Sequence, residues 1–242
     1  MLTLQNICIS FNNHIILKDL SQQVKDGDFI VIIGQNGSGK TTLLNLIAGT
    51  IFPKSGNLLL NQQSITTLNE CKRSQFISRL FQDPKQNVAL SLSIKQNLAL
   101  ALLKNKTATL CNGLNIVHQT PKLLEKCAHL FNHSIINKKM HELSGGQRQM
   151  IAFLMATATS PKILLLDEPT AALDPQATHK MVELINQHAS QHKSIIFMIT
   201  HDLEEATKLG NKLWIIKNEA ILEVNKQKET ITEQKIKKMF KE

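Results

Sequence analysis

The chain has 242 residues, of which 42% are hydrophobic, 4% are aromatic and none is tyrosine. This composition supports a sizeable core of aliphatic side chains and argues against a disordered chain. The formal net charge is +9, but the basic residues are spread along the sequence and thicken only between Lys226 and Lys241. The charge alone therefore does not choose between nucleic acid, an anionic membrane surface, a polyanionic ligand and a merely solvated basic face.

Apolar runs in the chain are short. The longest, such as Leu98–Leu103 and Phe29–Ile33, fall far below the roughly 18–20 residues that span a bilayer. Residues Met1–Phe11 contain no positively charged leader, so we expect neither a membrane span nor a signal peptide, and a chain that is soluble by itself. The cysteines, which include no CxxC pair and are expected to be thiols in a reducing compartment, are Cys8, Cys71, Cys111 and Cys127.

The first third of the chain combines strand and helix patterns. In chain order, hydrophobic periodicity and turn residues predict strands within residues 1–25, a strand at Phe29–Ile33 buried on both faces, a helix at Thr42–Ala48 that ends at Gly49, a hairpin around Ser55–Asn57 and a polar helix before residue 80.

From Pro84 to about Ser160 the pattern is helical and lacks buried-strand runs, which indicates an inserted helical lobe. The remaining elements predicted are a helix at Ser93–Leu103, a loop at Lys104–Asn115, strands at Ile163–Leu166 and Ile195–Thr200, helices at Pro175–Ala189 (with Asp174 as N-cap) and Asp202–Leu209, and a hairpin turning near Asn218–Glu219. Strands that alternate with helices predict an α/β fold with a mostly parallel sheet.

A glycine-rich loop follows the strand at Phe29–Ile33. Its G-x-x-x-x-G-K-[ST] pattern consists of Gly34, Gln35, Asn36, Gly37, Ser38, Gly39, Lys40 and Thr41, with Thr42 next. Glycines allow successive backbone N–H groups to face phosphate oxygens, and the following helix adds the positive end of its dipole. Lys40 is expected to reach the β- and γ-phosphates and Thr41 to ligate Mg²⁺. A plain glycine turn would not explain a lysine and a hydroxyl in this register.

Two carboxylates, Asp167 and Glu168, end the apolar strand at Ile163–Leu166. Because ligands bind at the carboxyl ends of parallel strands, both acids are expected beside the phosphate loop. Asp167 would then hold Mg²⁺ through water and Glu168 would act as general base toward the attacking water. Taken alone, the two acids could equally be helix-capping residues after a strand.

A second loop with anion-binding character lies at Leu143–Gln147. Ser144 and Gln147 fit a capping box that opens an apolar helix at Met150–Thr157. Gly145 and Gly146 lie inside the first turn, where they leave backbone N–H groups uncovered for a second anion. A capped helix alone would account for Ser144 and Gln147 but for neither glycine.

This set of motifs, Leu143–Gln147, Ile163–Pro169 and then Ala172–Asp174, resembles the ATP-binding cassette (ABC) family over nearly the whole chain, from Leu2 to about Val224. The resemblance implies a P-loop NTPase (RecA-like) core, an N-terminal antiparallel β subdomain and an inserted helical lobe at about residues 84–160. It assigns residues 1–225 to the ATP-binding domain and leaves 226–242 as a basic tail. It also implies an ATP-dependent homodimer, in which the loop at Ser144 completes the ATP site of the other chain.

The resemblance assigns further site residues. Phe11 matches the aromatic residue that stacks on adenine, where tyrosine is commoner, although a core phenylalanine remains an alternative. Gln82 matches the glutamine that contacts Mg²⁺ and the attacking water, and Asp174 matches an aspartate that crosses the dimer interface. His201 ends a buried strand and matches the histidine that contacts the γ-phosphate. Since no motif position is missing, we expect an active ATPase.

Partners follow from the same resemblance. A transport role requires a separate integral-membrane permease, whose loops would dock between helical lobe and core, so the chain is expected at the cytoplasmic face of the plasma membrane. The segments Asn97–Ala101, Ala171–Pro175, Leu209–Leu213 and Met239–Phe240 are most similar to bacterial importers of the aromatic amino acid group, which work with a solute-binding protein. The alternatives are a soluble ABC ATPase acting on nucleic acid or the ribosome, which we do not expect, and an exporter or lipid-extracting pump.

Overall fold

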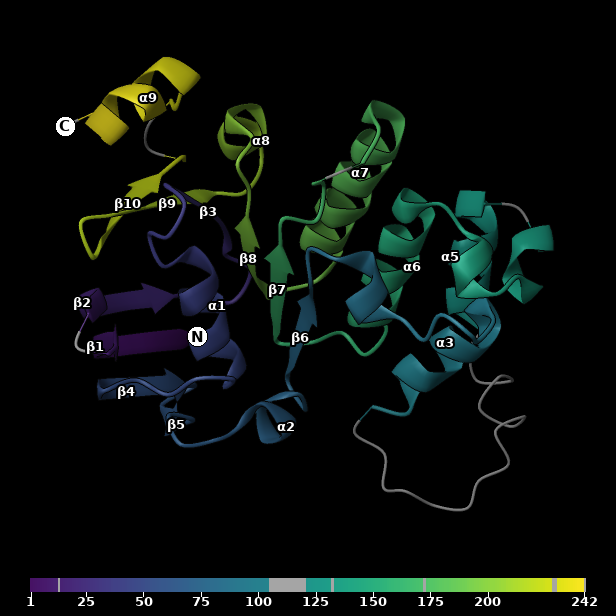
Figure 1. Cartoon of the computed structure of the whole chain (residues 1–242), viewed down its shortest axis with the longest axis horizontal. Coiled ribbons are helices and arrows are strands. Elements are labelled where there is room, and N and C mark those ends of the chain that lie inside the picture. The colour runs from purple at the N-terminus through teal and green to yellow at the C-terminus, as the bar shows by residue number, and fades with distance from the viewer. Residues whose placement is uncertain (13, 105–120, 132, 172, 228–229, 242) are drawn as a thin grey trace.

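Two β-sheets, one antiparallel and one mostly parallel, organise the chain (Figure 1). The computed structural model describes residues 1–12, 14–104, 121–131, 133–171, 173–227 and 230–241. The strands are β1 (Leu2–Phe11), β2 (His14–Val24), β3 (Phe29–Gly34), β4 (Ser55–Leu60), β5 (Gln63–Ser64), β6 (Ile77–Leu80), β7 (Ile163–Asp167), β8 (Ile195–Ile199), β9 (Lys212–Lys217) and β10 (Ala220–Asn225). The α-helices are α1 (Lys40–Ala48), α2 (Glu70–Arg73), α3 (Ile94–Leu102), α5 (Pro121–Phe131), α6 (Gly145–Thr157), α7 (Pro175–Gln191), α8 (Leu203–Lys208) and α9 (Glu233–Lys241), and short 3-10 helices span Pro84–Asn87, His133–Asn137 and Met140–Glu142.

The larger sheet has the strand order β10-β9-β3-β8-β7-β6. Its neighbours β6–β7, β7–β8, β8–β3 and β3–β9 are parallel, and β10 is antiparallel to β9. The smaller sheet, β2-β1-β4-β5, is antiparallel throughout. In the larger sheet the carboxyl ends of the parallel strands therefore share one edge, which is where ligands bind in open α/β sheets. This arrangement confirms the expected α/β class with an antiparallel N-terminal subdomain.

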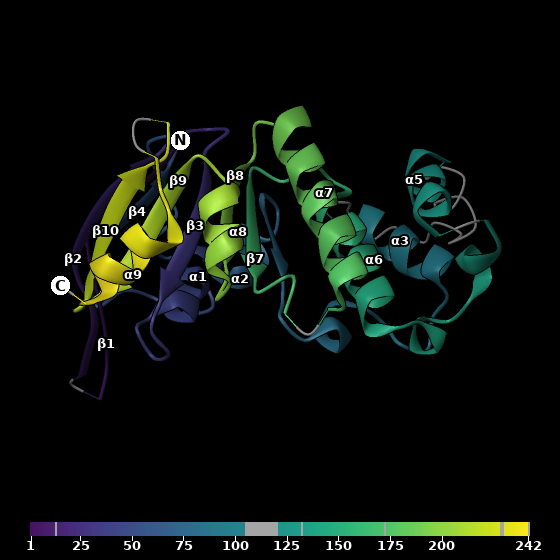
Figure 2. The same cartoon turned by 90° about the horizontal axis from the view of Figure 1, so that it is seen from above.

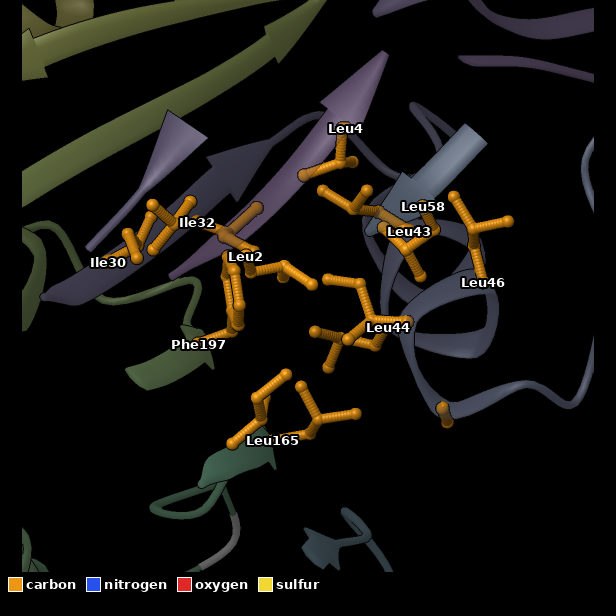
Figure 3. Packing of buried hydrophobic residues seen from close by; sticks show 14 of the residues in the cluster. Leu2, Leu4, Ile30, Ile32, Leu43, Leu44, Leu46, Leu58, Leu165 and Phe197 are labelled. Carbon is orange, nitrogen blue, oxygen red and sulfur yellow. The ribbon is translucent and has the colours of Figure 1, made fainter. Parts of the chain in front are cut away.

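Helix α1 fills the space between the two sheets. Its Leu43 and Leu44 are fully buried in a cluster that also contains Leu2 and Leu58 from the antiparallel sheet and Phe197 from β8 (Figure 3). A second cluster covers the other face of the large sheet with residues of α6, α7, α8 and α9. Apolar residues occupy both faces of β3, β7 and β8, as their continuous buried patterns require.

The helical lobe has a small core of its own. Ile94 and Leu98 of α3, Cys127 of α5 and Ile151 of α6 are buried together. Other residues of α6, among them Phe153, pack on the large sheet instead. Helix α6 is therefore shared between lobe and sheet, and Figure 2 shows it next to both α7 and α3.

A buried arginine fixes the end of α1. Arg73 is fully buried and donates to the carbonyls of Leu46 (2.5 Å) and Ile47 (2.9 Å) in the last turn of that helix. Its remaining N–H groups reach the carbonyls of Leu68 and Thr66. Burial lowers the pKa of Arg73 to about 10, so the group stays cationic near neutral pH. It therefore supplies the positive charge and donors that a helix C-terminus favours.

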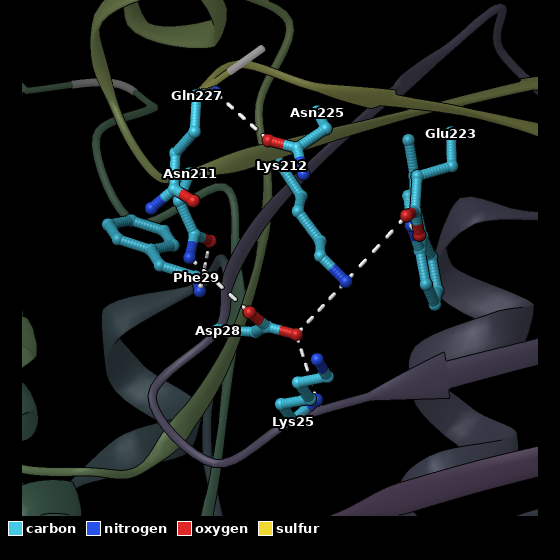
Figure 4. A network of polar contacts seen from close by, with 9 residues as sticks. Lys25, Asp28, Phe29, Asn211, Lys212, Glu223, Asn225 and Gln227 are labelled. Atoms are coloured by element: carbon cyan, nitrogen blue, oxygen red, sulfur yellow. Dashed lines mark hydrogen bonds and ion pairs between the residues drawn. The ribbon is translucent and has the colours of Figure 1, made fainter.

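The start of β3 is tied to β9 by polar contacts (Figure 4). Asp28 accepts from the backbone N–H of Lys25 at 2.8 Å and pairs with Lys212 of β9 at 3.0 Å. Asn211 accepts from the N–H of Phe29 at 2.9 Å, and Lys212 also lies 3.6 Å from Glu223 of β10. These contacts fix β3 at one end, and the glycine-rich loop leaves its other end.

Several element predictions need correction. Strand β6 was not expected, and the hairpin turn lies at Asn61–Gln62, both with positive φ, because Ser55–Asn57 pairs with β1 as part of β4. Helix α1 begins at Lys40, two residues before the predicted start. The turns at Gly49 and Asn218–Glu219 are confirmed by left-handed backbone.

Two expectations fall partly on residues that are not described. Of the predicted loop at Lys104–Asn115, only Lys104 lies within the described part, in a turn, and Cys111 also lies outside it. The other cysteines, Cys8, Cys71 and Cys127, are free thiols. Among the residues described, no helix combines the length and the apolarity that crossing a membrane requires.

Candidate active site

The glycine-rich loop connects β3 to α1 at the carboxyl edge of the large sheet. Gly37 and Gly39 have φ of 78° and 101°, which L side chains rarely adopt, so these two positions need glycine. Gly39 is the N-cap of α1 and provides no side chain to cap the helix. The first N–H groups of α1 are therefore available to an anion, and Asn36 is exposed while Thr42 is half-buried next to them.

Lys40 is folded back onto its own loop. Its Nζ donates to the carbonyls of Gly34 (2.9 Å) and Gln35 (3.0 Å), and the side chain is buried. Burial lowers the pKa of Lys40, while the negative charges of Glu168 and, to a lesser extent, Asp167 oppose this shift. The ammonium group thus donates to two loop carbonyls and is attracted by the charges of two nearby acids.

The loop leaves a polar cradle beside this lysine. The Ser38 hydroxyl is buried and has no hydrogen-bond partner, which native structures rarely leave unexplained. A Cβ on Gly34 would lie 2.5 Å from that hydroxyl and 2.9 Å from the Ile216 carbonyl, so only glycine fits there. An uncapped helix start, an unpartnered hydroxyl and a lysine fit a chain of phosphates.

Asp167, at the end of β7, pairs with an arginine that the sequence did not single out. Arg79 of β6 donates to its Oδ2 at 3.0 Å, and both side chains are about nine-tenths buried. The same guanidinium donates to Asn45 of α1 at 2.6 Å and stacks 4.5 Å above the ring of Phe81. In the sequence, Arg79 could be noticed only as a single cation within the short run Ile77–Leu80, and that run is recognisable as a strand only once β6 is known.

Glu168 stands at the centre of the site. Its φ is 48° and its N–H donates to the Ile199 carbonyl of β8 at 3.1 Å, which turns the side chain out of the strand direction. One carboxylate oxygen, Oε1, lies 2.8 Å from Nε2 of His201, and the other, Oε2, accepts from Gln82 at 3.0 Å. The structure therefore brings Gln82, Glu168 and His201 together from the ends of three neighbouring strands.

Oxygen donors suited to Mg²⁺ lie on the same edge. Thr41 is exposed at the start of α1, and Asp167 and Gln82 follow β7 and β6. Hydroxyl, amide and carboxylate oxygens are the hard ligands that this ion takes, usually with phosphate oxygens and water completing its shell. Within the described residues, no group of three His, Cys, Asp or Glu side chains could hold a metal.

The loop at Leu143–Gln147 opens α6 with the predicted capping box. Ser144 Oγ accepts from the Gln147 N–H at 3.2 Å, and Gln147 Oε1 accepts from the Ser144 N–H at 3.1 Å. The glycines differ: a Cβ on Gly146 would lie 2.9 Å from Cβ of Ala177 in α7, whereas one on Gly145 meets nothing within 4 Å. Packing therefore explains Gly146, and Gly145 leaves the first turn open to solvent.

Two further predicted residues lie away from this cluster. Phe11 ends β1 with 48% of its surface exposed, so it is available for stacking and is not a core residue. Asp174 caps α7, where its Oδ1 accepts from the Ala177 N–H at 2.9 Å, as expected for an N-cap.

A sequence profile described as "ABC transporter" matches residues 17–171, which is more than half of the chain. The chain belongs to the ABC transporter family. It is 40% identical to a tyrosine transport ATP-binding protein of Clostridioides difficile (strain R20291), covering 99% of this chain and 98% of that one. It is 33% identical to a thiamine import ATP-binding protein of Yersinia pseudotuberculosis serotype I, over 89% and 86% of the two chains. A spermidine/putrescine import ATP-binding protein of Mycoplasma mycoides subsp. mycoides SC is 31% identical over 96% of this chain, which spans 63% of that relative's length.

Solved structures agree with this assignment. An ATP-binding cassette described as a dimer in a post-hydrolysis state with ADP and Pi has a TM-score of 0.77 and 26% identity, covering 93% of this chain and 98% of that chain. Another cassette, in an ADP conformation, has a TM-score of 0.79 and 26% identity, covering 100% and 95%. This chain is accordingly an ATP-hydrolysing cassette subunit, and its P-loop NTPase fold is confirmed.

Proposed function

We propose that this cassette powers the import of a small, amino-acid-like solute through a separate membrane permease, with Glu168 as the general base of ATP hydrolysis. The observation that carries the catalytic assignment is the Glu168 carboxylate, held between Gln82 and His201 beside the glycine-rich loop. A general base must lie within hydrogen-bond reach of the proton that it takes, and the negative charge of Glu168 raises the pKa of Lys40, the lysine of the glycine-rich loop, against the effect of burial.

Each oxygen of the Glu168 carboxylate makes one contact in this structure, with His201 or with Gln82, and each keeps a lone pair that can accept from an attacking water. Gln82, which precedes the helical lobe, would turn its amide from Glu168 toward Mg²⁺ and the attacking water when nucleotide binds. His201 would then keep the carboxylate in place and place its ring toward the γ-phosphate. Lys40 would exchange its hydrogen bonds to two loop carbonyls for hydrogen bonds to phosphate oxygens. The new bonds are stronger, because both donor and acceptor are charged.

Mg²⁺ would be held by Thr41, Gln82 and Asp167, with Asp167 acting through water. When bound, the ion supplies charge that neutralises the phosphates. Arg79 pairs with the Asp167 carboxylate and holds it in position. Phe11 would stack on adenine, and Asp174, Ser144, Gly145 and Gly146 would meet the nucleotide or loop of a second chain.

The permease is expected in the groove between helical lobe and core. A cavity of about 410 Å³ lies there, bordered by Leu100 and Lys104 on the lobe side and by Arg79 and Phe81 on the core side. Lys104 spans the cleft, because its Nζ donates to the Ile77 carbonyl at 2.9 Å and to Ser78 Oγ at 2.6 Å. A permease in this groove would place the cassette on the cytoplasmic face of the membrane, with a solute-binding protein on the other side.

The solute class is supported by the tyrosine transport relative, which matches along almost its full length. Cassettes do not contact the transported molecule, so the other relatives, for thiamine and polyamines, share the same motor with different solutes.

The test of the catalytic proposal is the substitution Glu168→Gln. The variant should still bind ATP but hydrolyse it about 10²–10⁴-fold more slowly, since an amide cannot take a proton from water. Steady-state phosphate release and nucleotide binding by fluorescence would be measured side by side. Glu183→Gln, at an exposed position of α7, is the matched control and should hydrolyse ATP normally. A normal hydrolysis rate in Glu168→Gln would refute the role given to Glu168.

A further inference from the structure

The C-terminal helix α9 is docked on the core. Ile236 is fully buried in the cluster that covers the outer face of the large sheet, and Met239 and Phe240 pack against the same cluster. Figure 2 shows α9 alongside α8, the helix that follows β8, and the two are in contact. The basic residues Lys237 and Lys238 remain exposed on the opposite face. The tail is therefore an amphipathic helix whose apolar side belongs to the fold.

The last turn of α9 reaches the active-site edge. Phe240 borders a cavity of about 210 Å³ that is otherwise lined by Ile33, Gly34 and Gln35 at the end of β3 and by Thr200, His201 and Leu203 between β8 and α8. Gly34 and Gln35 are the residues whose carbonyls hold Lys40, and His201 is the partner of Glu168. One aromatic side chain thus lies behind both the phosphate loop and the histidine.

The turn that carries His201 is rigidly connected to α8. Thr200 Oγ1 donates to Glu205 at 2.6 Å and accepts from the Asp202 N–H at 3.1 Å. Asp202 in turn caps α8 by accepting from the N–H groups of Glu204 and Glu205. The position of α8 therefore sets the position of the His201 backbone. The His201 ring itself is half exposed, and Glu168 is the partner at hydrogen-bonding distance from its Nε2.

A second contact anchors the tail to the same helix. The ammonium group of Lys226, where the tail begins, donates to the Leu209 carbonyl just after α8. Burial lowers the pKa of Lys226 to about 8. Helix α8 is thus held at its end by Lys226 and along its side by α9, and Phe240 closes the cavity at its start.

We infer that Phe240 is a positioning residue for ATP hydrolysis: by closing the cavity that the β8–α8 turn lines, it holds His201 against Glu168. This inference rests on the role proposed above for His201. Losing the ring would enlarge this cavity and remove one of its walls, so the turn could shift into it, and small displacements of catalytic groups reduce rates steeply. Ile236 anchors the helix, whereas Phe240 affects the chemistry through His201.

The experiment is a double-mutant cycle in the full chain. Phe240→Ala should lower kcat about tenfold with little change in the KM for ATP, and Phe240→Leu should restore most of the rate. Met239→Ala, at the neighbouring half-buried position of α9, should cost some stability and leave kcat unchanged. In a His201→Ala background, Phe240→Ala should have no further effect, because residues that act through one another are not additive.

Imidazole ¹⁵N shifts provide a second readout that does not depend on activity. In nucleotide-free protein, the His201 signals of Phe240→Ala should move toward those of Glu168→Gln, while Met239→Ala leaves them in place. A normal kcat in Phe240→Ala, or an additive loss in the cycle, would overturn the inference and leave the role of His201 intact. A normal kcat in His201→Ala alone would instead refute the proposed role of that histidine, and the inference with it.

Discussion

Glu168 adopts a backbone conformation that is uncommon for a side chain of its size. A φ of 48° in a non-glycine residue costs on the order of 1–3 kcal/mol and persists only where the surroundings impose it. Here the imposing contact is the hydrogen bond from its N–H to Ile199 in the neighbouring strand. In this conformation the carboxylate contacts both Gln82 and His201.

His188 predicts a specific pH dependence of stability. It is buried between Phe153, in an edge-on contact, and His192, whose ring stacks on it at 4.6 Å. Burial is the main cause that lowers its pKa to about 4, followed by the charges of His192 and Lys126. Between pH 6.5 and pH 4 the unfolded chain therefore binds a proton that the folded chain does not, so stability falls as the pH is lowered through this window.

The corresponding measurement is chemical denaturation at pH 7 and pH 4, with His188→Phe as the comparison. The wild-type chain should lose roughly 2–3 kcal/mol more of its unfolding free energy than the variant does, since phenylalanine keeps the aromatic volume and cannot be protonated. Equal losses in the two proteins would show that His188 is already accessible to protons in the folded state.

The two glycines at the start of α6 differ in their surroundings: Gly146 is packed against α7, whereas Gly145 faces open space. Gly146→Ala should lower the unfolding free energy by about 1–3 kcal/mol, because its new Cβ would lie 2.9 Å from Cβ of Ala177 and force α6 away from α7. Gly145→Ala should leave it unchanged or raise it by about 0.5–1 kcal/mol, because that Cβ meets open space and alanine favours the helix. Thermal and urea unfolding of the two variants would reveal the difference, and the reverse order would contradict the packing account.

Among the structural elements, the strands and loops that are continuous in sequence were predicted well. Contacts between residues that are distant in sequence were not predicted. The buried strands and the loops at Gly34 and Ser144 are continuous in sequence, so periodicity and spacing indicated them. Strand β6 was missed because it has four residues and Arg79 interrupts its apolar run. That arginine donates to Asp167 and Asn45, which are distant from it in sequence. The contacts of Gln82 and His201 with Glu168 were likewise not derivable from spacing, since they join the ends of three strands.

The groove between α3 and the core predicts where the membrane partner lies. Leu100 on α3 and Leu222 on β10 are about equally exposed, at 48% and 50%, but only Leu100 borders the 410 Å³ cavity. With exposed Cys71 replaced by serine, Leu100→Cys should cross-link to an integral-membrane protein in native membranes, and Leu222→Cys should not. Mass spectrometry of the adducts identifies the partner. Equal labelling of both positions, or of neither, would argue against docking in this groove.

In the whole molecule, the two loops predicted to bind anions belong to different parts of the fold. The glycine-rich loop precedes α1, whereas the Ser144 loop opens α6, and both views place α1 and α6 on opposite sides of strands β7 and β8 (Figures 1 and 2). Each loop offers uncovered N–H groups at a helix start. If the proposed function holds, one chain offers two half-sites, and a head-to-tail pair of chains would let a single ATP use one half-site from each.

This pairing predicts that ATP drives dimerisation, with Glu168→Gln used to keep the nucleotide intact. That variant should run as a monomer alone and as a dimer with ATP and Mg²⁺ in light scattering coupled to gel filtration.

Ser144 and Ser93 provide a matched test of the Ser144 loop, since each is the N-cap in a complete capping box, at α6 and at α3 respectively. Replacing either by alanine should cost about 1 kcal/mol of stability through the lost cap. Only Ser144→Ala should also weaken the dimer, about tenfold, because two phosphate contacts are lost per pair. A Glu168→Gln chain that stays monomeric with ATP, or dimers equally weakened by both serine variants, would mean that the Ser144 loop is a helix cap and not half of an ATP site.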